Sequence, residues 1–524
     1  MSDVENEMRS HTDLPIKWRW ATLGDFGTWT SGGTPSRKHP EYFGGDIPWV
    51  KTGDLPDGPI TKIPETITSS GLENSSAKIC PPGTVLIAMY GATIGKLGTL
   101  SSGATTNQAC AALLPTMSNE DALPYVFKYL LYSRERLKAL GQGGAQPNIS
   151  QGILKEFPIA VAPLAEQERI VSKIDELFSR IEKGEQALEQ VRKLVERYRQ
   201  SVLKAAVTGE LTRTWREQQA KSGQQPESGQ ALLERILKAR REAWEKAELE
   251  KLRAKGKPPT NDKWKQKYKE PGPIETDYLG ELPDGWQRVR VDTAGETQLG
   301  RQRSPAHHSG DHMRPYLRVA NVFEERIDTD DVMEMNFTPE EFVTYGLRVD
   351  DILLNEGQSK ELVGRPAIYR DELPGSCFTN TLVRFRCTSA ILPEFALIVF
   401  LHFMKSGQFQ KIAKITTNIA HLGAGRFSEM AFPVPSLDEQ QEIVDRVNKQ
   451  RVAIDHFQND VVDRKKQVGT LRQSILKSAF SGQLVPQDPT DEPASTLLKR
   501  IADERAAQAE TETSTPRRGR RRRT

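Results

Sequence analysis

A long internal repeat is the feature of this sequence that most restricts its fold. Leu164-Ala-Glu-Gln-Glu-Arg-Ile-Val171 recurs as Leu437-Asp-Glu-Gln-Gln-Glu-Ile-Val444, a displacement of 273 positions from 164 to 437. The same displacement superposes Arg199-Gln-Ser-Val-Leu-Lys-Ala-Ala206 on Arg472-Gln-Ser-Ile-Leu-Lys-Ser-Ala479 without a gap. Self-similarity at a fixed spacing indicates one structural unit used twice. We therefore expect two equivalent halves.

Between the matching segments the apolar residues follow a heptad pattern, which predicts one long helix in each half, residues 164–211 and 437–484. Neither helix can bury its apolar stripe alone. Their equal length and common frame favour pairing with each other, although pairing of each helix with another chain is an alternative. The predicted seam consists of Ile170, Ile174, Leu177, Ile181, Leu188, Val191, Val195, Ile443, Val447, Ile454, Phe457, Val461, Val468 and Leu471.

An antiparallel arrangement of the two helices would place Gly184 and Phe457 near the middle of the seam. Glycine leaves space there, and a phenylalanine ring is large enough to fill it. We therefore expect the Phe457 ring to pack against Gly184.

A weaker repetition precedes each long helix. Leu14-Pro-x-x-Trp18 recurs as Leu282-Pro-x-x-Trp286, and Pro48-Trp-Val-Lys51 resembles Pro315-Tyr-Leu-Arg318. Short β-favouring runs alternate with Gly, Pro, Asn and Asp clusters, and a helix is predicted after them at 123–140 and 393–412. This pattern predicts an α+β chain in which two mixed α/β modules are separated by two long coiled-coil helices.

A charged stretch follows each long helix, and Ala231-Leu-Leu-Glu-Arg-Ile236 is echoed by Thr496-Leu-Leu-Lys-Arg-Ile501. The first stretch continues through residues 238–269, which we expect to form an exposed helix and then a linker. The predicted divisions are a tail (1–13), module one (14–163), helix one (164–211), a charged helical segment and linker (212–281), module two (282–436), helix two (437–484), a helical segment (485–510) and a basic disordered tail (511–524).

Composition excludes several classes of protein. A chain of 524 residues is too long for a single core. Cys80, Cys110, Cys377 and Cys387 are scattered without metal-binding spacing, so we expect reduced side chains. No apolar run is long enough to cross a bilayer, and the first twelve residues are polar, so a cytoplasmic protein is expected. The net charge is only +3, so any contact with DNA must come from local patches.

Motifs for catalysis are missing from the sequence. The Gly91-Ala-Thr-Ile-Gly-Lys96 segment is not a phosphate-binding loop, because its first glycine is one position too close and Leu97 stands where Ser or Thr is required. His307, His308 and His312 lie in a polar stretch and are interpreted as solvated side chains rather than metal ligands. We therefore predict no catalytic residue and no metal site in this chain.

The paired motifs resemble those of the specificity subunits of type I restriction-modification systems. The resemblance rests on Leu-Pro-x-x-Trp at the start of each half, Tyr90 to Lys96, Asn148-Ile-Ser150, Pro163 to Val171, and Leu203 to Leu211. It spans nearly the whole chain. Module two departs from the pattern, since Gln358-Ser-Lys-Glu-Leu-Val-Gly-Arg365 stands where module one has Tyr90 to Lys96.

Several expectations follow from this resemblance. Each module would be a target-recognition domain that reads one half of a split, asymmetric sequence in double-stranded DNA. The long helices would lie antiparallel and dock two methyltransferase subunits and, where present, restriction/translocase subunits. S-adenosylmethionine, ATP and Mg are then expected on these partner subunits and not on this chain. A cytosolic coiled-coil scaffold without DNA specificity is the alternative interpretation.

Readout of bases in the major groove uses Arg or Lys for guanine and Asn or Gln for adenine, on exposed loops. Some of these side chains should hold phosphates instead of bases. Asn107 and Asn380 each follow a Thr and are also candidates for capping a turn. The candidate DNA-binding residues are Arg37, Lys38, Lys51, Tyr90, Lys96, Asn107 and Gln108 in module one, and Arg301, Gln302, Arg303, Arg318, Asn321, Gln358, Lys360 and Arg365 in module two.

Overall fold

The computed structural model describes residues 14–141, 148–223, 227, 229–254, 257, 259–274, 277–416 and 418–514. Contacts divide the chain into a first unit, residues 1–188 with 463–524, and a second unit, residues 189–462. The helices α6 (Leu164–Val207) and α14 (Leu437–Phe480) each contribute one half to each unit. The two long helices expected from the heptad pattern are confirmed.

Module one of the first unit is built on two main sheets. The larger sheet has the order β2 (Trp29–Ser31), β9 (Cys110–Leu113), β6 (Val85–Ala88), β7 (Leu97–Leu100) and β4 (Gly58–Ile60). The smaller has the order β5 (Thr66–Ile67), β3 (Phe43–Val50) and β8 (Thr105–Thr106), and β1 (Arg19–Thr22) pairs with β10 (Pro158–Val161). Around them lie α2 (Ser69–Glu73), α3 (Leu123–Tyr132), α4 (Arg134–Ala139) and α5 (Gln151–Glu156).

Module two repeats this plan in the second unit. Its larger sheet has the order β12 (Gly295–Leu299), β21 (Leu382–Cys387), β17 (Ile352–Asn355) and β19 (Pro366–Ile368). Its second sheet has the order β16 (Met333–Asn336), β13 (Met313–Leu317) and β20 (Cys377–Phe378), and β11 (Gln287–Arg290) pairs with β24 (Ala431–Val434). Smaller elements are β14 (Val322–Phe323), β15 (Arg326–Ile327), β18 (Gly357–Gln358), β22 (Lys414–Thr416), β23 (Ile419–His421), α9 (Val291–Ala294), α10 (Pro339–Tyr345), α11 (Pro393–Lys405), α12 (Gln408–Ile412) and α13 (Ala424–Ser428).

The topology of the two modules confirms the internal repeat. In each module the middle strand of the smaller sheet, β3 or β13, has one antiparallel and one parallel neighbour. The helices predicted at 123–140 and 393–412 are present, and each is interrupted once by a short break. The predicted α+β class, with two mixed modules and long helices, is therefore correct.

The halves of α6 and α14 pack against each other antiparallel in each unit. In the first unit Glu185 pairs with Arg472 at 2.8 Å. In the second the Tyr198 hydroxyl donates to Oε1 of Gln450 at 2.8 Å. Of the predicted seam, the buried members are Ile170, Ile174, Ile181, Ile443, Val447, Ile454 and Val461, and the half-buried ones are Leu177, Leu188, Val195 and Val468.

The remaining seam predictions need correction. Val191, Leu471 and Phe457 are 40%, 50% and 56% exposed. A Cβ atom added at Gly184 would have no atom within 4 Å. The expected packing of the Phe457 ring on Gly184 is therefore wrong. Two paired helices cover only one side of each other, so part of each apolar stripe stays exposed.

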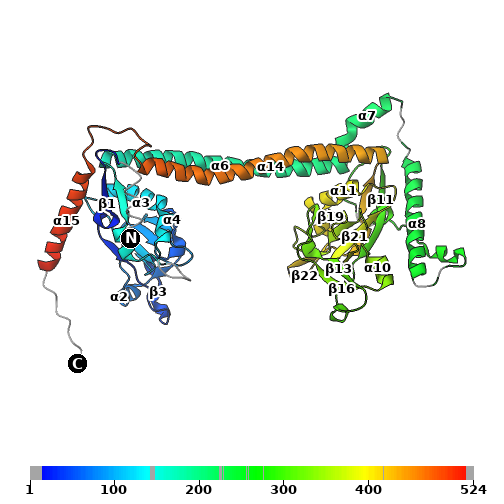
Figure 1. The fold of residues 1–524 in the computed structure, drawn as a ribbon, viewed down its shortest axis with the longest axis horizontal. Coiled ribbons are helices and arrows are strands. Elements are labelled where there is room, and N and C mark those ends of the chain that lie inside the picture. Colours follow the sequence, from blue (N-terminus) through cyan, green and yellow to red (C-terminus); the bar gives the residue numbers. More distant parts are fainter. Residues whose placement is uncertain are drawn as a thin grey trace. The chain divides into compact units, whose positions relative to one another are not determined.

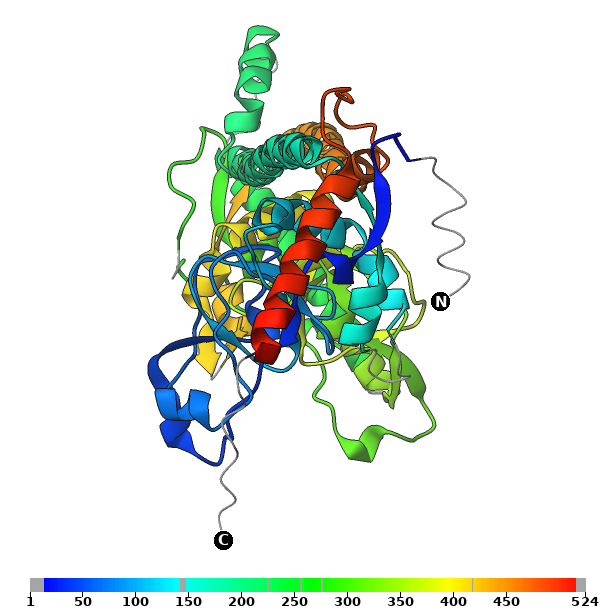
Figure 2. The same ribbon diagram turned by 90° about the vertical axis from the view of Figure 1, so that its left-hand side faces the viewer.

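A further helix packs on each module, and the two are related by the repeat. In the first unit α15 (Ala494–Ser514) lies across module one and buries Leu497 and Ile501 in its core (Figure 2). In the second unit α8 (Gly229–Ala254) runs along module two and buries Leu232 and Ile236 (Figure 1). The echo between residues 231–236 and 496–501 is thus a repeated packing surface.

The segment predicted as an exposed helix and linker over 238–269 is more ordered than expected. Nε of Arg240 on α8 donates to the carbonyl oxygen of Asp292 in module two at 2.8 Å. Beyond α8 a 3-10 helix (Asp262–Lys267) folds back, and Trp264 stacks on Trp244 with ring centroids 6.0 Å apart. The charged composition concealed this packing, because few aromatic residues provide it. The basic tail after residue 514 lies outside the described residues.

No helix in the described part of the chain is both long and apolar enough to span a membrane. The four cysteines are free thiols, and three of them are buried.

Candidate nucleic-acid interface

Each module is fastened to the beginning of the long helix that follows it. The indole N–H of Trp18 donates to Oε2 of Glu166 at 2.9 Å, and Trp286 donates to Oε2 of Glu439 at 2.9 Å. Both carboxylates are buried, at 1% and 4% exposure. Burial raises the pKa of Glu166 above its ordinary value. The Leu-Pro-x-x-Trp and Glu-Gln motifs are therefore two sides of one contact that holds the module in place.

Each Leu-Pro-x-x-Trp motif also contacts the end of the long helix from the other half of the chain. Gly209, which follows α6, and Gly482, which follows α14, both have a φ near +75°, at 75° and 73°. A Cβ at Gly209 would overlap the ring of Pro283, and a Cβ at Gly482 would overlap the ring of Pro15. Only glycine combines this backbone conformation with so close an approach.

Candidate DNA-binding residues of module one gather around Trp49 on β3. The Trp49 indole donates to the carbonyl oxygen of Gly33 at 3.0 Å, which fixes the loop that carries Arg37 and Lys38. The Arg37 guanidinium lies 5.4 Å from the Trp49 ring and pairs with Glu65 at 2.8 Å. Lys51 pairs with the same carboxylate. The exposed side chain of Gln108 joins this group through a hydrogen bond from Thr34.

Module two forms the corresponding group around Tyr316 on β13. The Arg303 guanidinium lies 5.7 Å from the Tyr316 ring. Arg318, at the position of Lys51, pairs with Asp331 as Lys51 pairs with Glu65. Gln302 is exposed beside Arg303. Each module therefore has a buried aromatic ring, an exposed arginine over it and a cation held by a carboxylate, with different residues in the two copies.

Two candidates in module two do not present their side chains to solvent. Arg301 is 8% exposed, with Nε pairing with Glu341 at 2.7 Å and Nη1 donating to the carbonyl oxygen of Asn336 at 2.8 Å. Asn321 is 2% exposed and accepts from the Arg318 amide at 3.0 Å. Both side chains therefore support the module in this structure, and their role in DNA binding stays a prediction.

Asn107 is half-buried, and its backbone N–H donates to the carbonyl oxygen of Val50 at 3.0 Å. Its carbonyl oxygen accepts from Cys110 at 3.2 Å and closes the turn before β9. In module two the matching bond to Leu317, at 3.1 Å, comes from Thr379 and not from Asn380. The turn after the Thr is therefore held by backbone groups.

A second group of candidates lies on the turn between two strands of the larger sheet. Gly95, with φ +78°, donates to Ala88 at 2.8 Å, and Gly364, with φ +75°, donates to Asn355 at 2.9 Å. The turn of module two is therefore the counterpart of the Tyr90-to-Lys96 turn despite two additional residues. Lys96 and Lys360 are exposed, whereas Tyr90, Gln358 and Arg365 are half-buried.

Arg365 lies 4.8 Å from the Phe323 ring, and burial lowers the pKa of its guanidinium. Burial likewise raises the pKa of the Tyr90 hydroxyl. The turns thus combine one exposed lysine each with side chains that are partly packed into the module.

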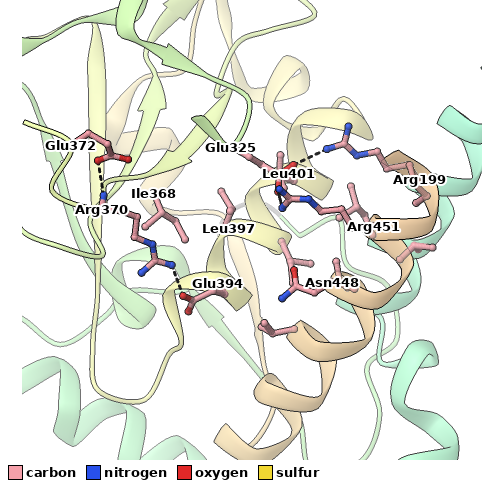
Figure 3. Close-up of a pocket in the computed structure, with 16 residues that line it drawn as sticks. Arg199, Glu325, Ile368, Arg370, Glu372, Glu394, Leu397, Leu401, Asn448 and Arg451 are labelled. Atoms are coloured by element: carbon pink, nitrogen blue, oxygen red, sulfur yellow. Dashed lines mark hydrogen bonds and ion pairs between the residues drawn. The ribbon is translucent and has the colours of Figure 1, made fainter. Parts of the chain in front are cut away.

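A cavity of about 230 Å³ lies in the second unit between module two and the halves of α6 and α14 (Figure 3). Glu325 pairs there with Arg199 and with Arg451, both at 2.7 Å, and Arg370 pairs with Glu394. Because these charges neutralise one another, we interpret the cavity as part of the packing interface between module two and the helices and not as a ligand site. The first unit has a cleft of about 750 Å³ at the corresponding place, lined by Asp57, Lys128, Asp175 and Arg472 among others.

The three histidines of the polar stretch remain apart from any ligand set. Across the described ranges, no group of three or more His, Cys, Asp or Glu side chains could hold a metal ion. His308 and His312 are exposed, and His307 is half-buried.

Two copies of one α/β module, each displaying basic side chains beside a buried aromatic ring, define a protein with two similar but non-identical recognition surfaces. The profile of the family described as "Type I restriction modification DNA specificity domain" matches residues 15–191 and 304–454. The chain belongs to this family and is a type I restriction-modification specificity subunit.

Individual relatives support the same assignment. The chain is 23% identical over 511 residues to the EcoKI specificity subunit of Escherichia coli (strain K12), covering 94% of this chain and 97% of that protein. It is 24% identical over 519 residues to the StySPI specificity subunit of Salmonella potsdam, covering 96% and 98%. A solved chain from a study of the assembly of a type I R-M system has the same fold, with a TM-score of 0.57 and 17% identity over 90% of this chain and 100% of that chain.

Proposed function

We propose that the two modules read the two halves of a split, asymmetric target in double-stranded DNA. The observation that supports this most strongly is the matched pair of groups in which an exposed arginine lies over a buried aromatic ring. Trp49, Arg37 and Lys51 in module one correspond to Tyr316, Arg303 and Arg318 in module two. A shared scaffold with different exposed side chains is suited to reading two different short sequences.

The chain itself contributes recognition and not catalysis in this proposal. Two methyltransferase subunits, and restriction/translocase subunits where a system has them, would dock on it in the cytoplasm. S-adenosylmethionine, ATP and Mg would be bound by those partners. The exposed apolar side chains on the long helices support a docking role, since such side chains are usually covered by a partner; in the second unit they are Val191, Leu194, Tyr198, Val452, Phe457 and Val462.

The experiment that tests this proposal is selection of bound sequences from a randomised duplex library, with the full chain co-expressed with its methyltransferase subunits. We expect two short motifs at a fixed separation, with no preference for the bases between them. Enrichment of one continuous motif, or of none, would contradict the proposal and favour a scaffold without DNA specificity.

A further inference from the structure

Positive charge in the second unit is concentrated in one helical hairpin. We call residues 238–254 and 259–269 the basic hairpin; they form most of α8 and the segment that folds back along it. These residues include ten Lys and Arg against five Asp and Glu, a net charge of +5, whereas the whole chain carries +3. The hairpin is thus more positive than the complete chain.

Aromatic packing holds the basic hairpin in a fixed shape. Trp244 on α8 stacks on Trp264, with 22° between the ring planes, and contacts Tyr268 edge to face. Nη1 of Arg240 donates to the Tyr268 hydroxyl at 2.6 Å and to the carbonyl oxygen of Lys269 at 2.8 Å. The returning segment is therefore fixed to α8, and its lysines project from a supported backbone.

Three lysines of the returning segment are available to a ligand. Lys265 pairs with Glu245 at 3.3 Å and Asp262 at 3.5 Å. Lys263, Lys267 and Lys269, in contrast, are exposed and form no ion pair with any residue of the described ranges.

Two of the neighbouring candidate DNA-binding residues supply little net charge of their own. Arg301 and Arg318 are each paired with a carboxylate, Glu341 and Asp331. Attraction to the phosphate backbone scales with the number of phosphates that free cations neutralise. The unpaired lysines of the basic hairpin are therefore better placed to supply it than these two arginines.

The basic hairpin is continuous with the candidate interface of module two. Glu250 on α8 pairs with Arg348 at 2.8 Å, immediately after α10. Figure 1 shows α8 beside α10, the helix that carries Glu341 and thereby holds Arg301. A duplex bound to the candidate DNA-binding residues of module two would therefore lie close to the basic hairpin.

We propose that the basic hairpin binds the phosphate backbone of duplex DNA beside the half-target read by module two, and that it contributes affinity without reading sequence. This inference rests on the proposed function. An acidic protein surface is the competing ligand, and the experiment below separates the two.

The test is DNA binding by the full chain co-purified with its methyltransferase subunits, followed by fluorescence anisotropy between about 50 and 200 mM salt. The duplexes are one with the selected target and one of unrelated sequence. In the variant Lys263→Gln, Lys267→Gln, Lys269→Gln we expect a shallower salt dependence. The magnitude of the negative slope of log K against log salt should decrease by about 0.9 for each lost phosphate contact, up to about 2.7. The preference for target over unrelated duplex should be unchanged, because backbone contacts carry no sequence information.

Two control variants sharpen the comparison. Lys183→Gln, Lys193→Gln, Lys449→Gln removes the same charge from exposed positions on α6 and α14 and should keep the parental slope. Lys263→Arg, Lys267→Arg, Lys269→Arg keeps the charge and should also keep the slope, which excludes a folding defect as the cause.

The outcomes distinguish this inference from the proposed function. A parent chain that does not prefer its target over unrelated DNA would refute the proposed function. A parent that does, with an unchanged slope in the Lys-to-Gln variant of the hairpin, would overturn the inference alone. An unchanged slope with loss of co-purifying methyltransferase subunits would overturn it in favour of a protein contact.

Discussion

The indole N–H of Trp286 donates a 2.9 Å hydrogen bond to Oε2 of Glu439, although 153 positions separate the two residues. Oε1 of the same carboxylate accepts from the Thr212 hydroxyl at 2.7 Å and pairs with Arg216. One buried carboxylate therefore joins the start of module two, the start of α14 and the segment after α6. Trp18 and Glu166 form the same bond in the first unit.

We predict that Trp286→Phe destabilises the second unit by about 1–3 kcal/mol, because a buried carboxylate loses a donor that water cannot replace. Urea unfolding followed by intrinsic fluorescence measures this change. The double variant with Glu439→Ala should cost less than the sum of the two single variants, since the second change removes the group left without its donor. Strict additivity would show that the hydrogen bond contributes nothing to stability.

The raised pKa of Glu166 makes a prediction about pH. Because burial raises the folded-state pKa above the ordinary 4.5, the folded chain binds this proton more tightly than the unfolded chain. The contribution of Glu166 to the free energy of unfolding is therefore largest below pH 4.5 and falls as pH rises through the raised pKa. The free energy of unfolding of Glu166→Gln should therefore increase relative to that of the parent as pH rises above 4.5. Midpoints of urea unfolding measure this difference.

Glu65→Gln is the matched control of opposite sign. Hydrogen bonds from Lys51 and then from Arg37 lower the pKa of Glu65, so its stabilisation is present at neutral pH and lost in acid. Relative to the parent, the free energy of unfolding of this variant should decrease as pH rises through the lowered pKa toward 4.5, and the difference should stay constant above 4.5. The same pH trend in both variants would contradict the assignment of burial as the dominant effect at Glu166.

Substitution of Gly209 tests the contact at the end of α6. Gly209→Ala combines a left-handed backbone, which costs a non-glycine residue about 1–2 kcal/mol, with an overlap between the new Cβ and Pro283. Gly280→Ala is the control, since Gly280 has a similar φ of 72° and no atom within 4 Å of a new Cβ. The free energy of unfolding should fall further for Gly209→Ala. Equal losses would show that the close approach to Pro283 has no energetic role.

Gly184 lies within a helix and has open space around it, so Gly184→Ala should raise the free energy of unfolding by about 1 kcal/mol. Ile174→Ala, at a seam position with 0% exposure, should lower it by about 2–5 kcal/mol. Thermal unfolding of the two variants beside the parent measures both effects. A loss of stability in Gly184→Ala would restore the packed seam that the heptad pattern suggested.

The long helices and the duplicated modules could be predicted from sequence. Heptad spacing of apolar residues indicates a helix directly, and repetition of a segment indicates a repeated structural unit. The bond between Trp18 and Glu166 could not be predicted, although both of their motifs were recognised. No local pattern relates residues 148 positions apart. The one indication of this contact in the sequence is that the Leu-Pro-x-x-Trp motif and the Glu-Gln motif are repeated together in both halves.

The candidate site was less predictable, because burial of a side chain depends on distant partners. Arg301 and Arg303 are the same residue type two positions apart, yet the first is buried and pairs with Glu341, 40 positions away, while the second is exposed. Phe457 shows the same limit on α14. Its heptad position is identical to that of buried seam residues, but the paired helices leave its ring exposed.

The central claim is that each module reads its own half of the target. Its most direct test is methylome sequencing of cells that express the methyltransferase subunits with a chimera in which a relative's module replaces residues 14–160. The parent and the chimera should methylate split sequences that share one half and differ in the other, with the same gap between them. A chimera that changes both halves, or neither, would contradict the account of two independent readers.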